Sequence, residues 1–253
     1  EISLGLVGSE MCIRDRNGLE AVIRRLDAME GDFRIRLSSL EPTVVDIEHI
    51  ERIVQYDKLC HHLHLSLQSG SDAILESMNR HYDREDYFKI VRSLRDFDPY
   101  FGITTDIIVG FPGETEENFM DTYRLVEEVG YSQVFTFIYS KREGTPAAEM
   151  DDDTPREVIQ ERFDRLVDLV QRKAFEANQA ELGATVPVLV EGTSKRDDSI
   201  LAGKSPKNQT VHAPVPAGAD ATSLVGRIVP VTIEEARTWY LSGTIVHLSL
   251  IHI

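Results

Sequence analysis

Residues 19–150 alternate between helix-like and strand-like patterns of apolar residues. Apolar side chains recur at helical spacing in five segments, which predicts helices over residues 19–29, 43–56, 72–78, 83–97 and 115–129. Short apolar or alternating runs lie between them and predict strands over residues 33–37, 63–67, 103–109 and 134–139. This regular alternation predicts parallel strands joined by right-handed crossovers.

Each of these predicted strands ends in a polar cluster. The clusters are SSLEP (38–42), QSGSD (68–72), GFPGE (110–114) and SKREGTP (140–146). The carboxyl ends of parallel strands meet at one edge, where α/β proteins bind their ligands. We therefore expect a barrel-like rim that carries the active site. The alternative is that loops are simply polar. This explains any single cluster but accounts less well for all four.

After residue 150 the pattern changes twice. Residues 154–157 (TPRE) read as a capping box with proline at the first helical position, and the helix should run to Leu182 with Gly183 as its stop. Alternating residues then predict short strands over 186–190, 210–212, 227–233 and 240–246, which is typical of a small antiparallel β-barrel. The expected architecture is α/β, with a partial barrel over 17–150, a bridging helix over 151–184 and a small β-barrel over 185–246.

Charge differs sharply between the two expected domains. Residues 17–184 carry 19 Lys and Arg against 34 Asp and Glu, whereas residues 185–245 carry six of each kind. An acidic first domain argues against broad non-specific nucleic-acid binding, which depends on phosphate neutralisation. In the second domain, basic residues lie among aromatic ones, which indicates single-stranded nucleic acid, although surface lysines are more often merely solvated. These residues are Lys195, Arg196, Lys204, Lys207, Arg237 and Trp239.

Composition excludes several further classes of protein. The sequence has no run of eighteen apolar residues, so we expect no membrane span. Two cysteines, Cys12 and Cys60, make neither a disulfide framework nor a cysteine-rich metal site. A cytoplasmic protein is the simplest expectation, with Cys60 as a small buried hydrophobe.

The two ends have an unusual property. Residues 11–16 and 248–253 can be back-translated into nucleotide strings that are reverse complements of each other, as in a sequencing-library adapter. We therefore expect residues 1–16 and 247–253 to be non-native and leave them out of the fold reasoning. The alternative is a genuine apolar N-terminal segment.

Five longer motifs occur in a fixed order. They are HLHLSLQSGSD (62–72), MNRHYDREDY (78–87), TTDIIVGFPGETEENF (104–119), FTFIYSKREGTPAAEM (135–150) and VLVEGTSKRD (188–197). In this order they resemble the radical SAM methylthiotransferases, and the C-terminal motifs are most similar to the MiaB group, which modifies tRNA. RLSSLEP (36–42) departs from that group and is more similar to the sister MtaB group, which acts on threonylcarbamoyladenosine.

The resemblance implies a radical SAM partial (βα) barrel followed by a TRAM domain, the small β-barrel that grips tRNA. It implies S-adenosylmethionine (S-adenosyl-L-methionine) and two 4Fe-4S clusters as cofactors, the anticodon stem-loop of tRNA as partner, and an electron donor for the clusters. The implied reaction adds a methylthio group to carbon 2 of a modified adenosine beside the anticodon. The expected substrate is isopentenyladenosine, and threonylcarbamoyladenosine is the alternative. A ribosomal-protein methylthiotransferase and a module that only binds RNA stay as alternatives.

The resemblance fails at the cluster ligands. The three-cysteine radical SAM motif does not occur in these residues, and Cys12 and Cys60 cannot replace it. We therefore expect no metal site or catalytic residue in this chain, and no methylthiolation by the chain alone.

The resemblance also assigns cofactor-binding residues to the rim. Ser38, Ser39 and Glu41 should contact the methionine or ribose, although Ser39 is equally suited to cap a helix. Gln68 and Ser69 suit the ribose hydroxyls, with a turn-stabilising role as the alternative for Ser69. The adenine should rest near the end of the third predicted strand, on Asp106, Ile108, Gly110 and Phe111.

Three other groups of residues have more than one interpretation. His62 and His64 share one strand face and could bind metal, but packing or hydrogen bonding is the favoured interpretation. Lys141 and Arg142 could meet tRNA phosphate or the cofactor carboxylate, or pair with Glu143. The run of acidic residues at 151–153 is expected to be solvated.

Overall fold

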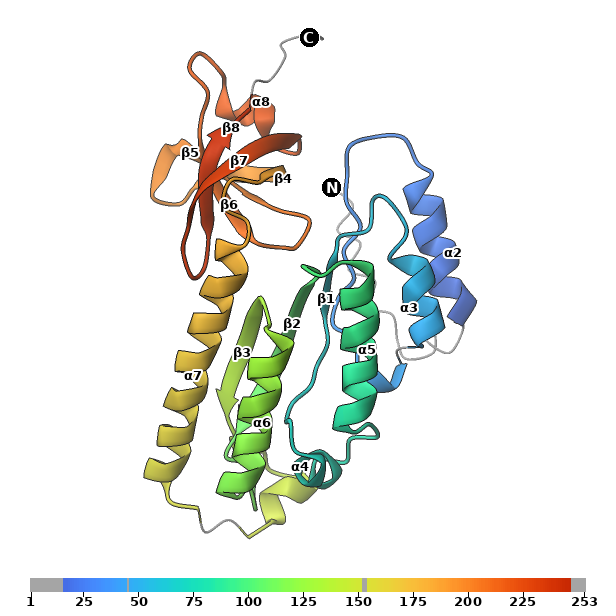
Figure 1. Cartoon of the computed structure of the whole chain (residues 1–253), viewed down its shortest axis with the longest axis vertical. Helices are drawn as coiled ribbons and strands as arrows, with labels where there is room; N and C mark the ends of the chain where they lie inside the picture. Colours follow the sequence, from blue (N-terminus) through green and yellow to red (C-terminus); the bar gives the residue numbers. More distant parts are fainter. Residues whose placement is uncertain (1–15, 45, 152–153, 247–253) are drawn as a thin grey trace.

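A computed structural model describes residues 16–44, 46–151 and 154–246. The expected non-native ends lie outside these residues except for Arg16, and so do two of the acidic residues in 151–153. The described chain forms two domains, a helix-covered parallel sheet and a small β-barrel, joined by the long helix α7 (Arg156–Gln179) (Figure 1). Among these residues no helix is long and apolar enough to cross a membrane.

The first domain is built on a parallel sheet in the order β1-β2-β3. The strands are β1 (His62–His64), β2 (Gly102–Val109) and β3 (Gln133–Ile138), and all pair in parallel, as the alternation of elements predicts. The predicted strand over 33–37 is wrong as a continuous strand. Only isolated parallel bridges, Ile35 to Leu59 and Leu40 to Leu65, join this extended segment to its neighbour, so no hydrogen-bond ladder develops.

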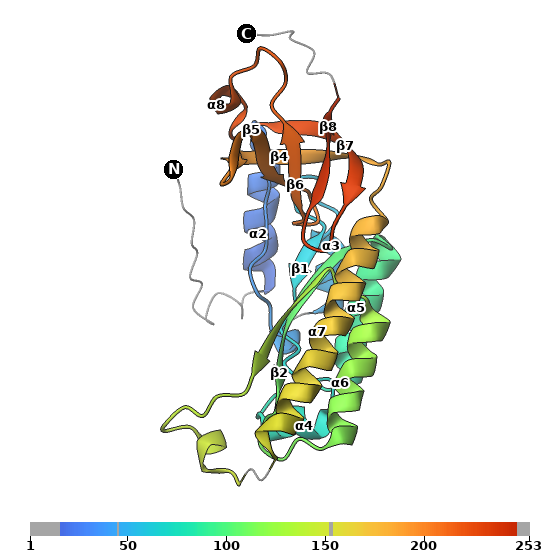
Figure 2. The same cartoon turned by 90° about the vertical axis from the view of Figure 1, so that its left-hand side faces the viewer.

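Helices cover one face of this sheet, and the other face is open (Figures 1 and 2). The covering helices are α3 (Ile47–Ile53), α5 (Arg84–Phe97), α6 (Glu116–Val129) and α7, and α2 (Arg16–Asp27) packs against α3. The short α4 (Asp72–Ser77) and two 3-10 turns, Pro42–Val44 and Pro146–Glu149, lie in the connections. Two side-chain N-caps fix the starts of α6 and α5. The Thr115 side chain accepts from the Asn118 N–H, and Asp83 accepts from the Asp86 N–H.

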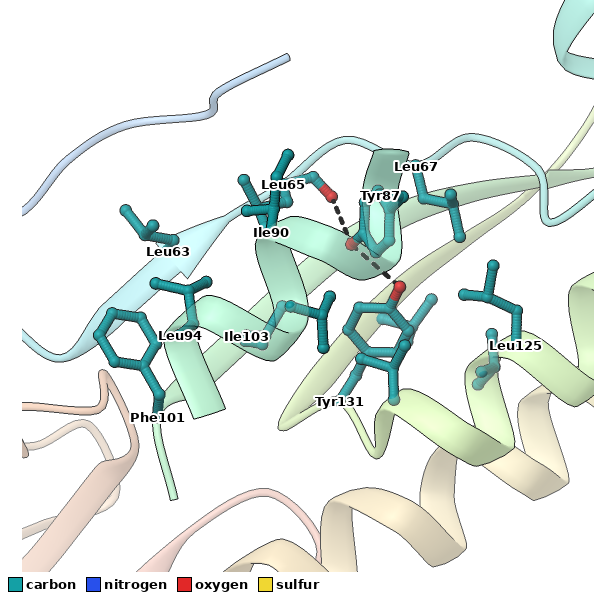
Figure 3. Close-up of a cluster of buried hydrophobic side chains, with 14 of the residues drawn as sticks. Leu63, Leu65, Leu67, Tyr87, Ile90, Leu94, Phe101, Ile103, Leu125 and Tyr131 are labelled. Atoms are coloured by element: carbon teal, nitrogen blue, oxygen red, sulfur yellow. Dashed lines mark hydrogen bonds between the residues drawn. The ribbon is translucent and has the colours of Figure 1, made fainter. Parts of the chain in front are cut away.

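A buried cluster between sheet and helices holds the layers together. It contains Leu63 and Ile103 from the strands and Leu65 just after β1, packed against Leu94 and other residues of the helices (Figure 3). Two tyrosines enter this core with their polar groups satisfied. The Tyr131 hydroxyl donates to the Tyr87 hydroxyl at 2.9 Å, and Tyr87 donates to the Leu65 carbonyl at 3.2 Å.

The linking helix differs from its prediction at both ends. It begins at Arg156, with Pro155 at the N-cap rather than inside the helix, and it ends at Gln179 rather than Leu182. The final turn tightens, because Glu181 N–H bonds to the Asn178 carbonyl three residues back.

The second domain is a closed five-stranded barrel in the order β4-β5-β6-β8-β7. Its elements are β4 (Thr185–Ser194), β5 (Asp197–Lys204), β6 (Thr210–Pro214), α8 (Ala221–Leu224), β7 (Ile228–Ala236) and β8 (Leu241–Ile245). The prediction missed β5, whose first residues are polar and whose end is Ala-Gly-Lys, so its apolar signal is weak. Pairing is antiparallel throughout except between β6 and β8, which run parallel.

Candidate cofactor and RNA-binding site

The open face of the sheet carries a hollow of about 390 Å³. Its lining comes from the extended segment before β1, from the three strands and from one residue of the second domain. The lining residues are Arg36, Leu37, Ser38, Ser39, His62, His64, Thr104, Asp106, Gln133, Phe135, Phe137 and Asn208. Strand register arranges several of them in rows, with Thr104 beside Gln133 and Asp106 beside Phe135.

Polar residues in the centre of the hollow form a hydrogen-bonded chain. The Thr104 hydroxyl lies 3.2 Å from His62 Nε2 and 3.0 Å from His64 Nδ1, and His64 Nε2 lies 3.1 Å from Asp106 Oδ2. Burial, with the nearby charge of Arg36, lowers the pKa of His62 to about 4, so its imidazole is neutral at pH 7. These contacts agree with the hydrogen-bonding role favoured for the two histidines.

The predicted rim residues occupy different environments. Ser38 and Ser39 are exposed at the hollow, and Asp106 lines it. Ile108 lies on the same strand two residues further and is partly buried. Glu41 is exposed and pairs with Arg80, 2.9 Å between Oε1 and Nη1. Ser39 caps no helix here, because the N-cap of α3 is Asp46.

The QSGSD turn faces the helices more than the hollow. The Ser69 side chain is fully buried, and its hydroxyl lies 3.3 Å from that of Thr122 on α6. The Gly70 N–H donates to the same Thr122 hydroxyl at 2.9 Å. These contacts favour the turn-stabilising alternative for Ser69. Gln68 lies beyond β1 in the left-handed region, at φ 70°. Its backbone N–H donates to the Asp106 carbonyl, and its carbonyl accepts from the Ile108 N–H, both on β2.

The GFPGE turn is held from the side of α7. Gly110 has φ 74°, and a Cβ at this position would lie 2.6 Å from Ile159 Cγ2, so only glycine fits. The Gly110 N–H donates to Glu114 Oε2 at 2.9 Å. Phe111 is buried and meets the ring of Tyr139 edge to face at 5.2 Å. The missing side chain at Gly110 therefore makes room for Ile159 of α7.

One polar atom near this turn has no internal partner. The Tyr139 hydroxyl is buried, and within residues 16–44, 46–151 and 154–246 nothing hydrogen-bonds to it. Buried hydroxyls are normally paired, so an orphan beside Phe111 fits a rim that receives a polar ligand. The exposed Ser38 and Ser39 hydroxyls belong to the same open face. These groups fit the ribose and amino-acid portions of a cofactor such as S-adenosylmethionine.

The predicted basic residues fall into two groups. Lys141, Arg142, Lys195 and Arg196 are exposed, the last two at the turn between β4 and β5. Arg237 is exposed and pairs with Glu235, and Trp239, 53% exposed, follows it in the β7–β8 hairpin.

Lys204 and Lys207, by contrast, lie between the domains. The Lys207 ammonium is 2.7 Å from Glu181 Oε1 and 5.2 Å from the Tyr100 ring centre. The Lys204 ammonium donates to the Thr210 hydroxyl at 2.9 Å. The Lys207 charge is thus engaged between the domains, whereas the Lys204 ammonium bonds within the barrel.

The described residues do not fit an iron–sulfur cluster. Within that part of the chain no three His, Cys, Asp or Glu side chains gather as a metal site. Its one cysteine, Cys60, is buried, and burial raises the pKa of its thiol, which disfavours the thiolate that iron requires.

Sequence comparison agrees with this architecture. Residues 8–126 match the Radical SAM superfamily, and residues 179–246 match the TRAM domain. This chain therefore combines a radical SAM match in its first half with a TRAM match in its barrel. The predicted order, a radical SAM sheet followed by a TRAM barrel, is thereby confirmed.

Three curated relatives of this chain carry the same name, tRNA-2-methylthio-N(6)-dimethylallyladenosine synthase. The protein of Alkaliphilus oremlandii is 45% identical over 89% of this chain and 47% of its own length. That of Acetivibrio thermocellus is 44% identical over 92% and 48%, and that of Oceanobacillus iheyensis 47% identical over 84% and 40%. The chain therefore spans about half the length of the curated relatives it matches.

Among solved structures, coproporphyrinogen III oxidase (HemN) from Escherichia coli, described as a radical SAM enzyme, superposes with a TM-score of 0.49. It is 16% identical and covers 76% of this chain and 51% of its own.

Sequence reasoning missed several residues of the hollow. Arg36, Thr104, Gln133, Phe135 and Phe137 lie on the open face beside the residues it selected. Alternation in QVFTFI (133–138) places Gln133, Phe135 and Phe137 on one face and could have found these three. No sequence signal could have found Asn208, because it reaches the hollow from the other domain.

Proposed function

We propose that this chain is part of a tRNA methylthiotransferase that adds a methylthio group to carbon 2 of isopentenyladenosine beside the anticodon. The observation that carries the proposal is the pairing of a radical SAM sheet and a TRAM barrel in one chain 44–47% identical to relatives of that name. The exposed basic and aromatic side chains of the barrel support RNA as the partner.

In this proposal the rim binds S-adenosylmethionine, which supplies a 5′-deoxyadenosyl radical when it is bound beside a cluster in the whole protein. Ser38 and Ser39 offer hydroxyls to the ribose or methionine portions, and Asp106 can accept a hydrogen bond from the cofactor. Phe111 shapes the turn from the buried side. Glu41 and Gln68 would complete the rim at the neighbouring strand ends.

The clusters and the electron donor lie outside what these residues provide. We propose that the chain alone does not methylthiolate RNA, because its described residues have no cluster ligands. Anaerobic reconstitution with iron and sulfide should leave the purified chain without a cluster absorbance band. A stoichiometric band that survives desalting would contradict this. The whole enzyme is proposed to work in the cytoplasm, with tRNA.

The test of the reaction uses the full-length protein of which this chain is part. It is expressed in a bacterial strain that lacks tRNA methylthiolation, and the tRNA nucleosides are analysed by mass spectrometry. We expect 2-methylthio-isopentenyladenosine to appear. A methylthio group found only on threonylcarbamoyladenosine would overturn the substrate, since RLSSLEP (36–42) points that way. Unchanged tRNA from a well-expressed protein would overturn the reaction class.

A further inference from the structure

The TRAM barrel contributes a residue to the hollow of the radical SAM sheet. Asn208 lies in the turn between β5 and β6, and it lines the hollow together with His62, Thr104 and Gln133. The hollow is therefore formed by both domains.

The turn that carries Asn208 is braced on several sides. The Asn208 N–H donates to the Ser205 carbonyl at 3.0 Å, and the Gln209 side chain donates to Asn178 Oδ1 of α7 at 3.1 Å. From the sheet domain, the Arg34 guanidinium donates to the Lys204 carbonyl at 2.7 Å and to the Pro187 carbonyl at 2.6 Å. These contacts hold the turn against the sheet, so the Asn208 side chain is presented by a rigid support.

Asn208 itself is in the left-handed region, at φ 65°. Asparagine tolerates this region better than other residues with a side chain, although glycine adopts it at lower cost. An asparagine held here, facing a polar hollow, is consistent with a use for its amide rather than with a purely conformational role.

Polar groups at this end of the hollow lack partners. Neither the Asn208 nor the Gln133 side-chain amide hydrogen-bonds to any residue in the part of the chain that the structure describes. His62 is 2% exposed, and its Nδ1 is buried and has no partner among the same residues. Buried polar atoms are normally paired, so an unpaired imidazole nitrogen beside two open amides indicates a ligand that supplies donors and acceptors.

Aromatic side chains line the neighbouring wall. Phe135 is 41% and Phe137 51% exposed, and both belong to the face of β3 that also carries Gln133. An exposed phenylalanine pair provides a stacking surface for a heterocyclic base. A carboxamide presents a donor and an acceptor side by side, the pattern that complements the N7 and N6 edge of adenine. The hollow, about 390 Å³, is in the size range of small-molecule sites, roughly 300–1,000 Å³.

We infer that an unstacked purine base of the RNA enters this hollow and that Asn208 of the TRAM barrel contacts the edge of that base. The inference rests on the proposed function for the identity of the RNA. Phe135 and Phe137 stack on the base, and the amides of Asn208 and Gln133 read its edge. The TRAM barrel thus forms part of the base-binding cavity in addition to gripping RNA on its outer surface.

The test uses the whole chain and an anticodon stem-loop RNA in two forms, one with adenosine beside the anticodon and one with 2-aminopurine there. Fluorescence polarisation of the end-labelled adenosine form reports affinity with the N7 and N6 edge intact, and 2-aminopurine emission from the other form reports stacking of that one base. With the unaltered chain, we expect binding and quenched emission. Asn208→Gly keeps the left-handed backbone and removes the amide. We expect it to weaken binding about tenfold, the equivalent of one or two lost hydrogen bonds, and to restore emission.

Asn79→Gly is the matched control. Asn79 is also left-handed, at φ 57°, but it is exposed and does not line the hollow, so its substitution should change neither signal. Phe137→Ala is a second variant whose exposed side chain can be removed without opening the core, and it should also restore emission.

The outcomes separate the two ideas. Wild-type affinity and quenching in both Asn208→Gly and Phe137→Ala would overturn the inference and leave tRNA binding intact. Binding of the unaltered chain without quenching would overturn it too. No binding at all by the unaltered chain would remove RNA as the partner, and the inference would fall with the proposed function.

Discussion

Arg162 of α7 and Glu114 of the GFPGE turn form an ion pair inside the protein. The Arg162 Nη1 lies 3.5 Å from Glu114 Oε2 and donates to the Glu114 carbonyl at 2.9 Å, and the two side chains are 5% and 2% exposed. Arg162 Nε also reaches Glu116 at 3.0 Å. Glu114 in turn accepts from the Gly110 N–H, so this pair connects the linking helix to the turn that we propose for the cofactor.

Removing Arg162 should destabilise the first domain. At pH 8, where the Glu114 carboxyl is mostly ionised, Arg162→Leu leaves this carboxylate buried without its partner, and we expect the free energy of unfolding to fall by about 3–5 kcal/mol. Urea unfolding followed by circular dichroism measures this. Arg172→Leu is the matched control on the same helix. Its pair with Glu127 is exposed, 52% and 53%, so its loss should cost less than about 1 kcal/mol. Equal losses in the two variants would contradict the assignment.

The stability of the chain should depend on pH through Glu114. Burial raises the pKa of Glu114 to about 7 from its ordinary 4.5, and this outweighs the Gly110 N–H and Arg162, which lower it. Between those pH values the folded state binds the proton more tightly than the unfolded state. The contribution is therefore fully present below pH 4.5 and is lost as the pH rises toward 7, by up to about 3 kcal/mol.

Glu114→Gln tests this pH dependence, because the amide resembles the protonated acid and does not titrate. Unfolding free energies at pH 5 and pH 8 should differ less in the variant than in the unaltered chain. Identical pH dependence in the two proteins would show that Glu114 does not titrate in this window.

Gly70 should not tolerate a side chain. A Cβ there would lie 2.6 Å from the Thr122 Cα, which is backbone of α6 and cannot rotate away. We expect Gly70→Ala to separate the QSGSD turn from α6 and lower the thermal midpoint by several degrees. Gly192→Ala is the control, since a Cβ at Gly192 meets nothing within 4 Å, and the midpoint should barely move. A neutral Gly70→Ala would mean that turn and helix can shift apart freely.

RNA binding should depend on the exposed basic side chains of the barrel and not on those at the domain interface. Lys195→Ala and Arg196→Ala should each reduce the slope of log affinity against log salt by about 0.7, the value for one phosphate contact on a single strand. Trp239→Ala should weaken binding by about 1–3 kcal/mol through lost stacking and leave the slope unchanged.

The contrasting variant for RNA binding is Lys207→Ala. Its ammonium already pairs with Glu181, so we expect it to alter domain packing and leave the salt slope alone. Filter binding of an anticodon stem-loop over a range of salt concentrations measures both quantities. A slope unaffected by Lys195→Ala and Arg196→Ala would exclude that turn from the RNA interface.

Much of the fold followed from local pattern. Helix α6 could be predicted because Thr115 and Gly130 mark its ends and its apolar residues recur at helical spacing, and these signals do not depend on distant residues. Strands with clear apolar runs, such as β2, were equally predictable. β5 was not, since its stability comes from closure of the barrel between β4 and β6 rather than from its own polar residues.

The sequence by itself determined the kinds of the two domains, their order and the face of β2 that carries Asp106, because motifs, caps and strand alternation are local properties. Only the tertiary structure decided which side chains are free to act. It directs Ser69 toward α6, assigns Lys207 to Glu181, and brings Asn208 to the hollow beside His62. These relationships join residues far apart in the chain, and their geometry comes from packing between layers and domains, which no local pattern encodes.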